Sequence, residues 1–327
     1  MRANKVYPTC LPVDVRRLCR TGLALWLATA SAMAANGEEP AGTSLPSVAQ
    51  CSEIEVLVGT EKRCLRPTDS FRDCAECPEM VVVPAGSFMM GSPSGEDGRL
   101  DREGPQGEVT IGQPFAVGKF EVTFAEWDAC VTAGGCMHRP DDRGWGRGRR
   151  PAINVSWDDI TTEYLPWLSR LTGKSYRLLT EAQWEYAARG LRIASAPSAA
   201  YWWGDKASRE HANYGRDQCC AGHKEGRDQW ENTAPVGQFP ANPLGLHDMH
   251  GNAWEWVEDC WHDSYVGAPT DASAWTTSCV DTTRVLRGGS WLEGPQGLRS
   301  AWRTRIRPAV RIFNYGTGFR VGRMLSP

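Results

Sequence analysis

The amino-acid sequence predicts a compact, loop-rich α+β fold with little regular secondary structure. The chain has 327 residues with 34 Gly and 21 Pro, which interrupt helices and strands, and no long periodic segment follows Gly190. A fold with few backbone ladders needs other sources of stability. The 15 Trp, the cysteines and bound metal are expected to supply them.

Short strand patterns occur in both halves of the chain. Met80–Pro84 (MVVVP) and Gly86–Gly91 (GSFMMG) predict a strand, a turn and a second strand. Further short strands are predicted at 284–287, 298–303 and 318–323.

Three helix starts carry capping boxes, in which a Ser or Thr is followed three residues later by an acidic residue or Gln. They predict helices over about 123–131, 156–171 and 180–189. Gly190 is expected to end the third helix in the left-handed conformation. Pro166 lies inside the second and is expected to kink or shorten it, because proline lacks the amide donor.

The N-terminus has the three parts of a secretory signal in order. Arg16, Arg17 and Arg20 precede an apolar run over 21–30, and Ala32-Met33-Ala34 supplies small residues for cleavage. The alternative, an apolar N-terminus on a cytosolic chain, does not explain that order. We therefore expect a signal peptide over 1–34, a linker and Cys-bearing extension over 35–78, and one domain over 79–327. Export to the periplasm or medium, without a membrane anchor, follows.

The charge balance of the processed chain excludes some partners. Cleavage would remove five basic and one acidic residue from totals of 36 and 39, leaving 31 basic and 38 acidic residues. A mildly acidic protein is a poor binder of nucleic acid or of an anionic membrane surface. We expect no nucleic-acid partner and a monomer.

Ten cysteines remain after cleavage, which in an exported chain indicates disulfides. Neighbours in sequence suggest Cys51–Cys64, Cys74–Cys77, Cys130–Cys136 and Cys260–Cys279. The Cys74–Cys77 spacing also suits a redox-active or zinc-binding CxxC motif, but the sequence contains no second CxxC and no nearby His to complete a zinc site. Cys219 and Cys220 could form a vicinal disulfide, pair with separate partners, or remain buried thiols.

Eight segments carry a family resemblance, in order, over nearly 250 residues. They are MVVVPAGSFMMG (80–91), VGKFEVTFAEW (117–127), PAINVSW (151–157), YRLLTEAQWEYAARG (176–190), TAPVGQFPAN (233–242), GLHDMHGNAWEW (245–256), RVLRGGSW (284–291) and GFRV (318–321). Together they resemble the formylglycine-generating enzyme family, also called sulfatase-modifying factors. The resemblance implies a compact C-type-lectin-like fold.

The resemblance also implies two structural calcium sites. The first would use the side chains of Asn213 and Asp228 and the carbonyls of Tyr214 and Trp230. The second would use the side chains of Asp248 and Glu255 and the carbonyls of Gly251 and Ala253. Calcium takes oxygen ligands of these kinds, although the same residues could simply cap loops. His247 and His250 raise the alternative of zinc, which the motif favours less.

The copper site of the family is missing. Family members oxidise a sulfatase cysteine within Cys-x-Pro-x-Arg, using copper held by two thiolates a few residues past the GGS motif. Here Gly288-Gly289-Ser290 is followed by no cysteine through residue 327. Glu293 and Leu298 lie near the expected positions. Thiolates are the ligands that suit Cu(I), so copper is not expected.

The substrate groove implied by the resemblance supplies the candidate catalytic residues. They are Ser290, Trp291, Glu293, Arg299 and Arg303. These side chains could form a polar and aromatic pocket for a peptide, a protein or a small aromatic ligand, or they could belong to the core. We expect a divergent oxidation or modification enzyme similar to the pyoverdine-maturation proteins, rather than a sulfatase activator. The alternative is a non-catalytic module that binds a peptide, glycan or protein.

Overall fold

A computed structural model describes residues 53–190, 199–215, 225–312 and 316–325. The signal peptide, Cys51, Cys219 and Cys220 lie outside these residues, so the predictions for them stay predictions. The bounds of the strands are β1 Ile54–Val58, β2 Glu61–Leu65, β3 Ser70–Phe71, β4 Met80–Val83, β5 Gly86–Met90, β6 Gly107–Ile111, β7 Phe115–Gly118, β8 Tyr176–Leu178, β9 Trp254–Cys260, β10 Arg284–Arg287, β11 Arg303–Ile306, β12 Thr317–Phe319 and β13 Val321–Met324. The helices are α1 Phe124–Thr132, α2 Trp157–Asp159, α3 Leu165–Thr172 and α4 Glu181–Arg189, with the short turns η1 Asp101–Glu103, η2 Ile160–Tyr164 and η3 Pro295–Leu298.

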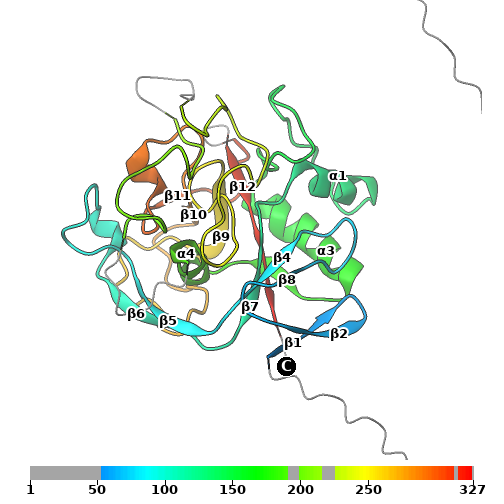
Figure 1. Ribbon diagram of the computed structural model, residues 1–327, viewed down its shortest axis with the longest axis horizontal. Coiled ribbons are helices and arrows are strands. Elements are labelled where there is room, and N and C mark those ends of the chain that lie inside the picture. The colour runs from blue at the N-terminus through cyan, green and yellow to red at the C-terminus, as the bar shows by residue number, and fades with distance from the viewer. Residues whose placement is uncertain (1–52, 191–198, 216–224, 313–315, 326–327) are drawn as a thin grey trace, which may run out of the picture. The chain divides into compact units, whose positions relative to one another are not determined.

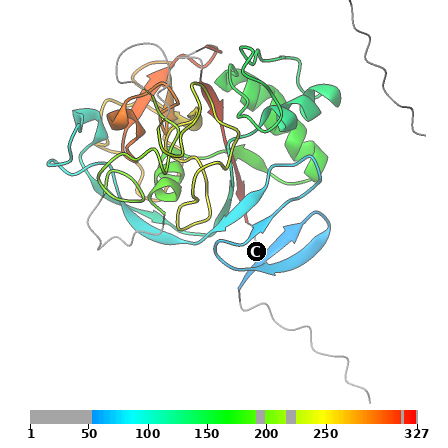
Figure 2. The same cartoon turned by 45° about the horizontal axis from the view of Figure 1, so that its top comes forward.

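Two larger sheets organise the described residues (Figure 1). One has the strand order β3-β4-β7-β13-β8 and the other β11-β10-β9-β12, while β1–β2 and β5–β6 form two-stranded sheets. The view in Figure 2 shows the β1–β2 hairpin at the edge of the body. The predicted α+β class with long connecting loops is confirmed. None of the described helices has the length and apolar character required to cross a bilayer.

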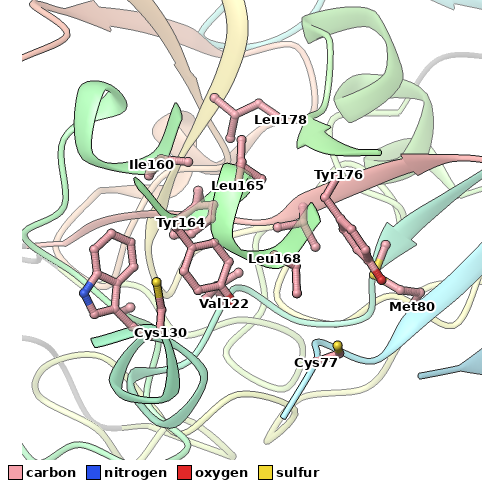
Figure 3. Close-up of a cluster of buried hydrophobic side chains, with 14 of the residues drawn as sticks. Cys77, Met80, Val122, Cys130, Ile160, Tyr164, Leu165, Leu168, Tyr176 and Leu178 are labelled. Atoms are coloured by element: carbon pink, nitrogen blue, oxygen red, sulfur yellow. The ribbon is translucent and has the colours of Figure 1, made fainter. Parts of the chain in front are cut away.

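The five-stranded sheet is buried on both faces, which explains the uninterrupted apolar run of β4. Met80 and Val82 face a core that includes α1 and α3, whereas Val81 and Val83 face a second core that includes α4. Figure 3 shows the first core, where Tyr164 lies among apolar side chains from several elements. There Trp127 stacks on Tyr164 with ring centroids 5.3 Å apart.

The helix predictions are confirmed at their starts and ends. Thr123, Ser156 and Thr180 are N-caps with reciprocal capping boxes. Gly190 ends α4 with a φ of 63°. Pro166 interrupts the second helix as expected: a π-helical turn, in which the Leu165 amide donates to the Ile160 carbonyl, lies between α2 and α3.

Removal of the Thr123 hydroxyl tests the contribution of one cap. Thr123 Oγ1 accepts a hydrogen bond from the Glu126 amide at 3.3 Å, and Glu126 Oε2 accepts one from the Thr123 amide at 2.7 Å. We expect Thr123→Ala to lower the free energy of unfolding by about 1 kcal/mol in urea titrations. Thr123→Ser should retain most of that stability. Equal losses in the two variants would contradict a capping role.

The second half of the chain departs from the sequence prediction in three places. β10 has the predicted bounds, but the strand predicted at 298–303 is wrong, because Leu298 ends the 3-10 turn η3 and β11 begins at Arg303. The strand predicted at 318–323 is divided at Arg320 into β12 and β13, which belong to different sheets. β9 was not predicted as a strand.

Three of the predicted disulfides are confirmed, and they close loops in separate parts of the chain. They are Cys74–Cys77, Cys130–Cys136 and Cys260–Cys279. Cys64 is also disulfide-bonded. The extension over 35–78 supplies β3, which pairs with β4 in the five-stranded sheet. The Cys74–Cys77 cross-link thus lies between two neighbouring strands of that sheet.

Candidate functional site

The loop over 248–252 doubles back sharply and turns its backbone inward. Asp248, Gly251 and Asn252 have φ values of 57°, 85° and 62°. Gly251 cannot be replaced without rearrangement, because a Cβ atom there would lie 2.2 Å from the Asn213 carbonyl oxygen. The loop therefore packs directly on the segment that carries the first predicted calcium site.

Glu255 is held by a complete set of donors. Arg320 Nε lies 2.9 Å from Oε1 and 2.8 Å from Oε2, and Arg320 Nη2 lies 2.7 Å from Oε1. Trp184 Nε1 donates to Oε2 at 2.7 Å. Both members of the ion pair are 1% exposed. Arg320 is the residue that separates β12 from β13, so its burial accounts for the break between those strands.

Two further buried carboxylates lie within electrostatic reach of this pair. Asp248 Oδ2 accepts from the Gly237 amide at 2.7 Å. Glu121 is 1% exposed, and its Oε2 has no hydrogen-bond partner within the described part of the chain. Burial raises the pKa of Asp248 to about 6. Burial, followed by repulsion from Asp248, raises the pKa of Glu121 well above its usual value.

This charge distribution suits a divalent cation. The carboxylates of Glu121, Asp248 and Glu255 lie near one buried guanidinium, that of Arg320, which gives an excess of two negative charges if all are ionised. Arg149 also lies near Asp248, but it is exposed and is not counted among the buried charges. Among the described residues, no three His, Cys, Asp or Glu side chains are grouped closely enough to hold a metal by themselves. A calcium ion here would need the predicted carbonyls of Gly251 and Ala253 as well.

Asn252 links the two predicted calcium loops. Its Nδ2 donates to Glu121 Oε1 at 2.9 Å, and its Oδ1 accepts from Asn213 Nδ2 at 3.1 Å. Its carbonyl accepts from the Trp291 amide at 3.0 Å. Neither Asn252 nor Glu121 was among the predicted site residues, although both lie inside family-like segments.

The first predicted calcium site contains a guanidinium. Arg209 Nη1 donates to the Tyr214 carbonyl and lies 3.2 Å from Asp228 Oδ2. The amides of Tyr214 and Trp230 also donate to the Asp228 carboxylate, at 3.2 and 3.3 Å. Burial raises the pKa of Asp228 to about 6 despite these donors. Arg209 was not among the predicted residues.

The predicted groove residues divide into two groups, and the first surrounds Glu293. Glu293 is partly exposed, and Trp254 Nε1 donates to its Oε1 at 3.4 Å. Trp291 is buried and meets Trp145 edge-on with ring centroids 5.2 Å apart. Its Nε1 has no partner in the described segments. Ser290 is fully buried beside Trp291.

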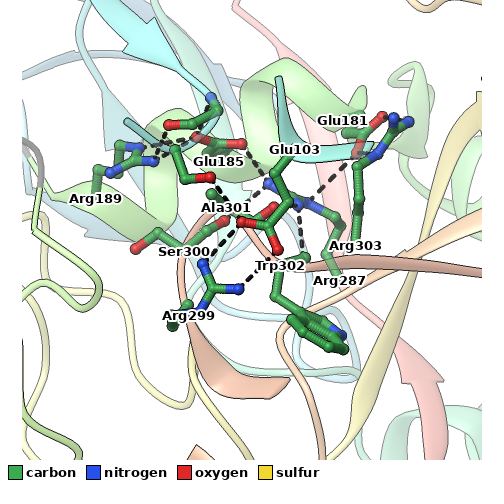
Figure 4. Close-up of polar contacts among 12 residues, drawn as sticks. Glu103, Glu181, Glu185, Arg189, Arg287, Arg299, Ser300, Ala301, Trp302 and Arg303 are labelled. Atoms are coloured by element: carbon green, nitrogen blue, oxygen red, sulfur yellow. Dashed lines mark hydrogen bonds and ion pairs between the residues drawn. The ribbon is translucent and has the colours of Figure 1, made fainter. Parts of the chain in front are cut away.

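Arg299 and Arg303 form the second group and belong to a buried ion-pair network (Figure 4). Arg303 is fully buried and makes two hydrogen bonds to Glu181, at 2.8 and 2.7 Å. Arg299 pairs with Glu103 at 2.7 Å and Glu96 at 2.6 Å. Of the five groove candidates, only Arg299 lines the nearby cavity of about 610 Å³, which Glu96 and Tyr201 also line.

The two histidines considered for zinc make hydrogen bonds to carbonyls. His247 Nδ1 lies 2.8 Å from the Phe239 oxygen, and His250 Nδ1 lies 2.6 Å from the Leu298 oxygen. Burial lowers the pKa of His250 to about 4, so its ring is neutral at physiological pH. The two rings thus support neighbouring loops.

Comparisons with known proteins agree with this architecture. The model of the sulfatase-modifying factor enzyme 1-like domain matches residues 67–325. The formylglycine-generating enzyme of Thermomonospora curvata is 27% identical over 299 residues, covering 74% of this chain and 92% of that protein. The inactive C-alpha-formylglycine-generating enzyme 2 of Mus musculus is 30% identical over 287 residues, covering 73% and 82%.

A solved structure extends the comparison to three dimensions. In the structure of PvdO from Pseudomonas aeruginosa, the sequence is 40% identical to this chain and the TM-score is 0.68. The match covers 80% of this chain and 100% of the PvdO chain. The match to the family model and this likeness agree with the eight sequence segments. The chain belongs to the formylglycine-generating enzyme, or sulfatase-modifying factor, family.

Proposed function

We propose that the chain is an exported oxidation or modification enzyme that does not activate sulfatases. The observation that carries this proposal is the absence of cysteine from the sequence between residue 280 and residue 327, where the family places its copper thiolates. A carboxylate such as Glu293 is a hard ligand and does not replace a pair of thiolates for Cu(I). We therefore assign no copper-dependent step to this site.

Glu293 is the predicted groove residue that offers a partly exposed carboxylate. It accepts a hydrogen bond from Trp254 Nε1, while the indoles of Trp254 and Trp291 are buried beneath the surface and fix the segment that carries this carboxylate. Such a carboxylate can accept a proton from a bound substrate, provided that the substrate hydroxyl or amine reaches it. The likeness to PvdO, a protein of pyoverdine maturation, supports a substrate of the pyoverdine type.

The sulfatase-activator activity has a direct test. We expect no formylglycine when the purified protein is incubated with copper, oxygen and a Cys-x-Pro-x-Arg peptide, and mass spectrometry measures the product. A formylglycine-generating enzyme that retains its cysteine pair serves as the positive control. Formylglycine above the level of a protein-free reaction would contradict the proposal.

Glu293→Gln tests the assigned site. With a pyoverdine-type peptide as the probe, we expect turnover to fall by about 10²-fold or more, the lower end of what a general base contributes. Glu61→Gln, an exposed change in β2, is the control and should keep full turnover. Unchanged turnover in Glu293→Gln would contradict the site, and saturable binding without turnover would favour a binding module.

Calcium completes the proposal as a structural ion. We propose that it binds at the loop of Asp248 and Glu255, where the excess buried negative charge supports it. The three disulfides that join described cysteines are consistent with an extracytoplasmic location, the periplasm or the medium.

A further inference from the structure

The two loops that the family resemblance assigns to calcium differ in how their charge is balanced. Near Asp248, three buried carboxylates face one buried guanidinium. At Asp228, one fully buried carboxylate is paired with Arg209, whose side chain is 9% exposed. The first loop therefore has no comparable excess of negative charge for a metal ion to neutralise.

The position of Arg209 is also the position that the ion would need. Its Nη1 contacts both the Tyr214 carbonyl oxygen and Asp228 Oδ2, two of the four atoms expected to bind the first calcium. Calcium binds oxygen at about 2.3–2.6 Å, so an ion bound to those two oxygens would overlap Nη1. From these contacts we infer that the Arg209 guanidinium replaces the first calcium ion, and that this loop is stabilised without metal.

Arg209 is fixed in this position by contacts beyond the two oxygens. Its guanidinium lies over the Tyr214 ring, 4.3 Å from the centroid, and its Nε lies 3.6 Å from Glu225. Glu225 and Asp228 exchange two backbone hydrogen bonds, of 2.8 and 3.0 Å, which close a tight turn between these two partners of Arg209. Displacement of the guanidinium by an ion would break the contacts to the Tyr214 ring and to Glu225.

The replacement has a physical reason, and it leaves two of the four predicted ligands without a contact to Arg209 Nη1. A guanidinium supplies a positive charge and several donors to oxygens that otherwise need a cation, and it cannot be lost by chelation. The predicted ligands that remain are the Trp230 carbonyl and Asn213 Oδ1, and Asn213 Oδ1 has no hydrogen-bond partner in the described part of the chain. Removal of the guanidinium should therefore leave all four predicted oxygen ligands available to an ion, with water completing the coordination.

Calcium content measured in variants of the full processed protein tests this inference. The probe is calcium itself, measured by equilibrium dialysis and elemental analysis, with thermal unfolding recorded in calcium and in chelator. We expect Asp228→Asn to keep the calcium content of the wild type. We expect Arg209→Ala to bind one more ion per chain and to gain a calcium-dependent rise in Tm, while Arg209→Lys, which keeps the charge, gains neither.

Each result decides the inference. Loss of an ion in Asp228→Asn would overturn it, as would an Arg209→Ala variant that folds and binds no additional calcium. If Arg209→Ala does not fold, the Asp228→Asn comparison alone decides. Asp248→Asn reports on the other loop, and we expect it to lose the calcium ion proposed there. If the wild type itself contains no calcium, the ion proposed near Asp248 is refuted. The Arg209 inference is then tested by whether Arg209→Ala gains an ion.

Discussion

Replacement of Glu185 by glutamine is expected to lower the free energy of unfolding by about 3–5 kcal/mol, because it removes the carboxylate that two buried guanidinium groups contact at hydrogen-bond distance. Glu185 is fully buried in α4, and so is its partner Arg287 in β10. Its Oε1 also accepts from the Gly91 amide at 2.8 Å and from Arg189 Nη2 at 2.7 Å.

The loss should be large because the network connects elements far apart in sequence. Arg287 Nη1 and Nη2 donate to the carbonyls of the segment 300–302, at 2.6 to 2.9 Å. That segment joins Arg299, at the cavity, to Arg303 in β11. Figure 4 shows these groups converging between α4 and the backbone of Ser300–Trp302. The network therefore supports the segment that carries two of the groove candidates.

Urea unfolding followed by Trp fluorescence measures this effect. The matched control is Glu55→Gln in the β1–β2 hairpin, where Glu55 and Lys62 form an ion pair with side chains 44% and 72% exposed. An exposed pair contributes about 0–1 kcal/mol, so the control should unfold almost as the wild type does. A loss of less than about 1 kcal/mol in Glu185→Gln would show that the other carboxylates compensate.

Local features of the fold could be predicted from the sequence because they depend on residues a few positions apart. The capping boxes at Thr123, Ser156 and Thr180 and the left-handed Gly190 are of this kind. The apolar run of β4 likewise identifies a strand. The family resemblance supplied the overall fold, which composition alone restricted only to a loop-rich class.

The missed features depend on contacts that are distant in sequence. Arg320 pairs with Glu255 from 65 positions away, and this contact divides a segment that its sequence suggests is one strand. Arg209 reaches Asp228 across 19 positions. One signal was available: Glu121 and Arg320 each lie between apolar residues, in Phe-Glu-Val and Phe-Arg-Val. A charged residue in such a setting is buried only with a partner, which predicts a pair without identifying it.

Removal of calcium is the second change with a large expected effect. With the ion bound near Asp248 as proposed, chelation should lower the free energy of unfolding by an amount set by the ratio of free calcium to the Kd. The loss is about 2.7 kcal/mol if the free calcium concentration before chelation is 100 times the Kd, and about 4.1 kcal/mol if it is 1,000 times the Kd. Thermal or urea unfolding in calcium and in chelator measures the difference. Asp248→Asn should lose most of the response, whereas the exposed control Asp101→Asn should keep it.

The variant Glu121→Gln tests whether calcium stabilises the fold by neutralising buried negative charge, because it removes the charge of residue 121 and keeps its hydrogen bond. Without calcium, the wild type must bury an uncompensated Glu121 carboxylate or take up a proton there, and both cost free energy at neutral pH. Glutamine avoids this cost and can still accept from Asn252 Nδ2. We therefore expect Glu121→Gln to be more stable than the wild type in chelator and less responsive to calcium.

The pH dependence gives the same distinction without a mutation. Burial raises the pKa of Asp248 to about 6 in the folded chain, above its value in the unfolded chain. The folded state then binds more protons, so stability in chelator should increase as pH falls through about 6. With calcium bound, the ion supplies the missing positive charge, and that increase should disappear. A protein equally stable with and without calcium at every pH would show that no calcium binds at this loop.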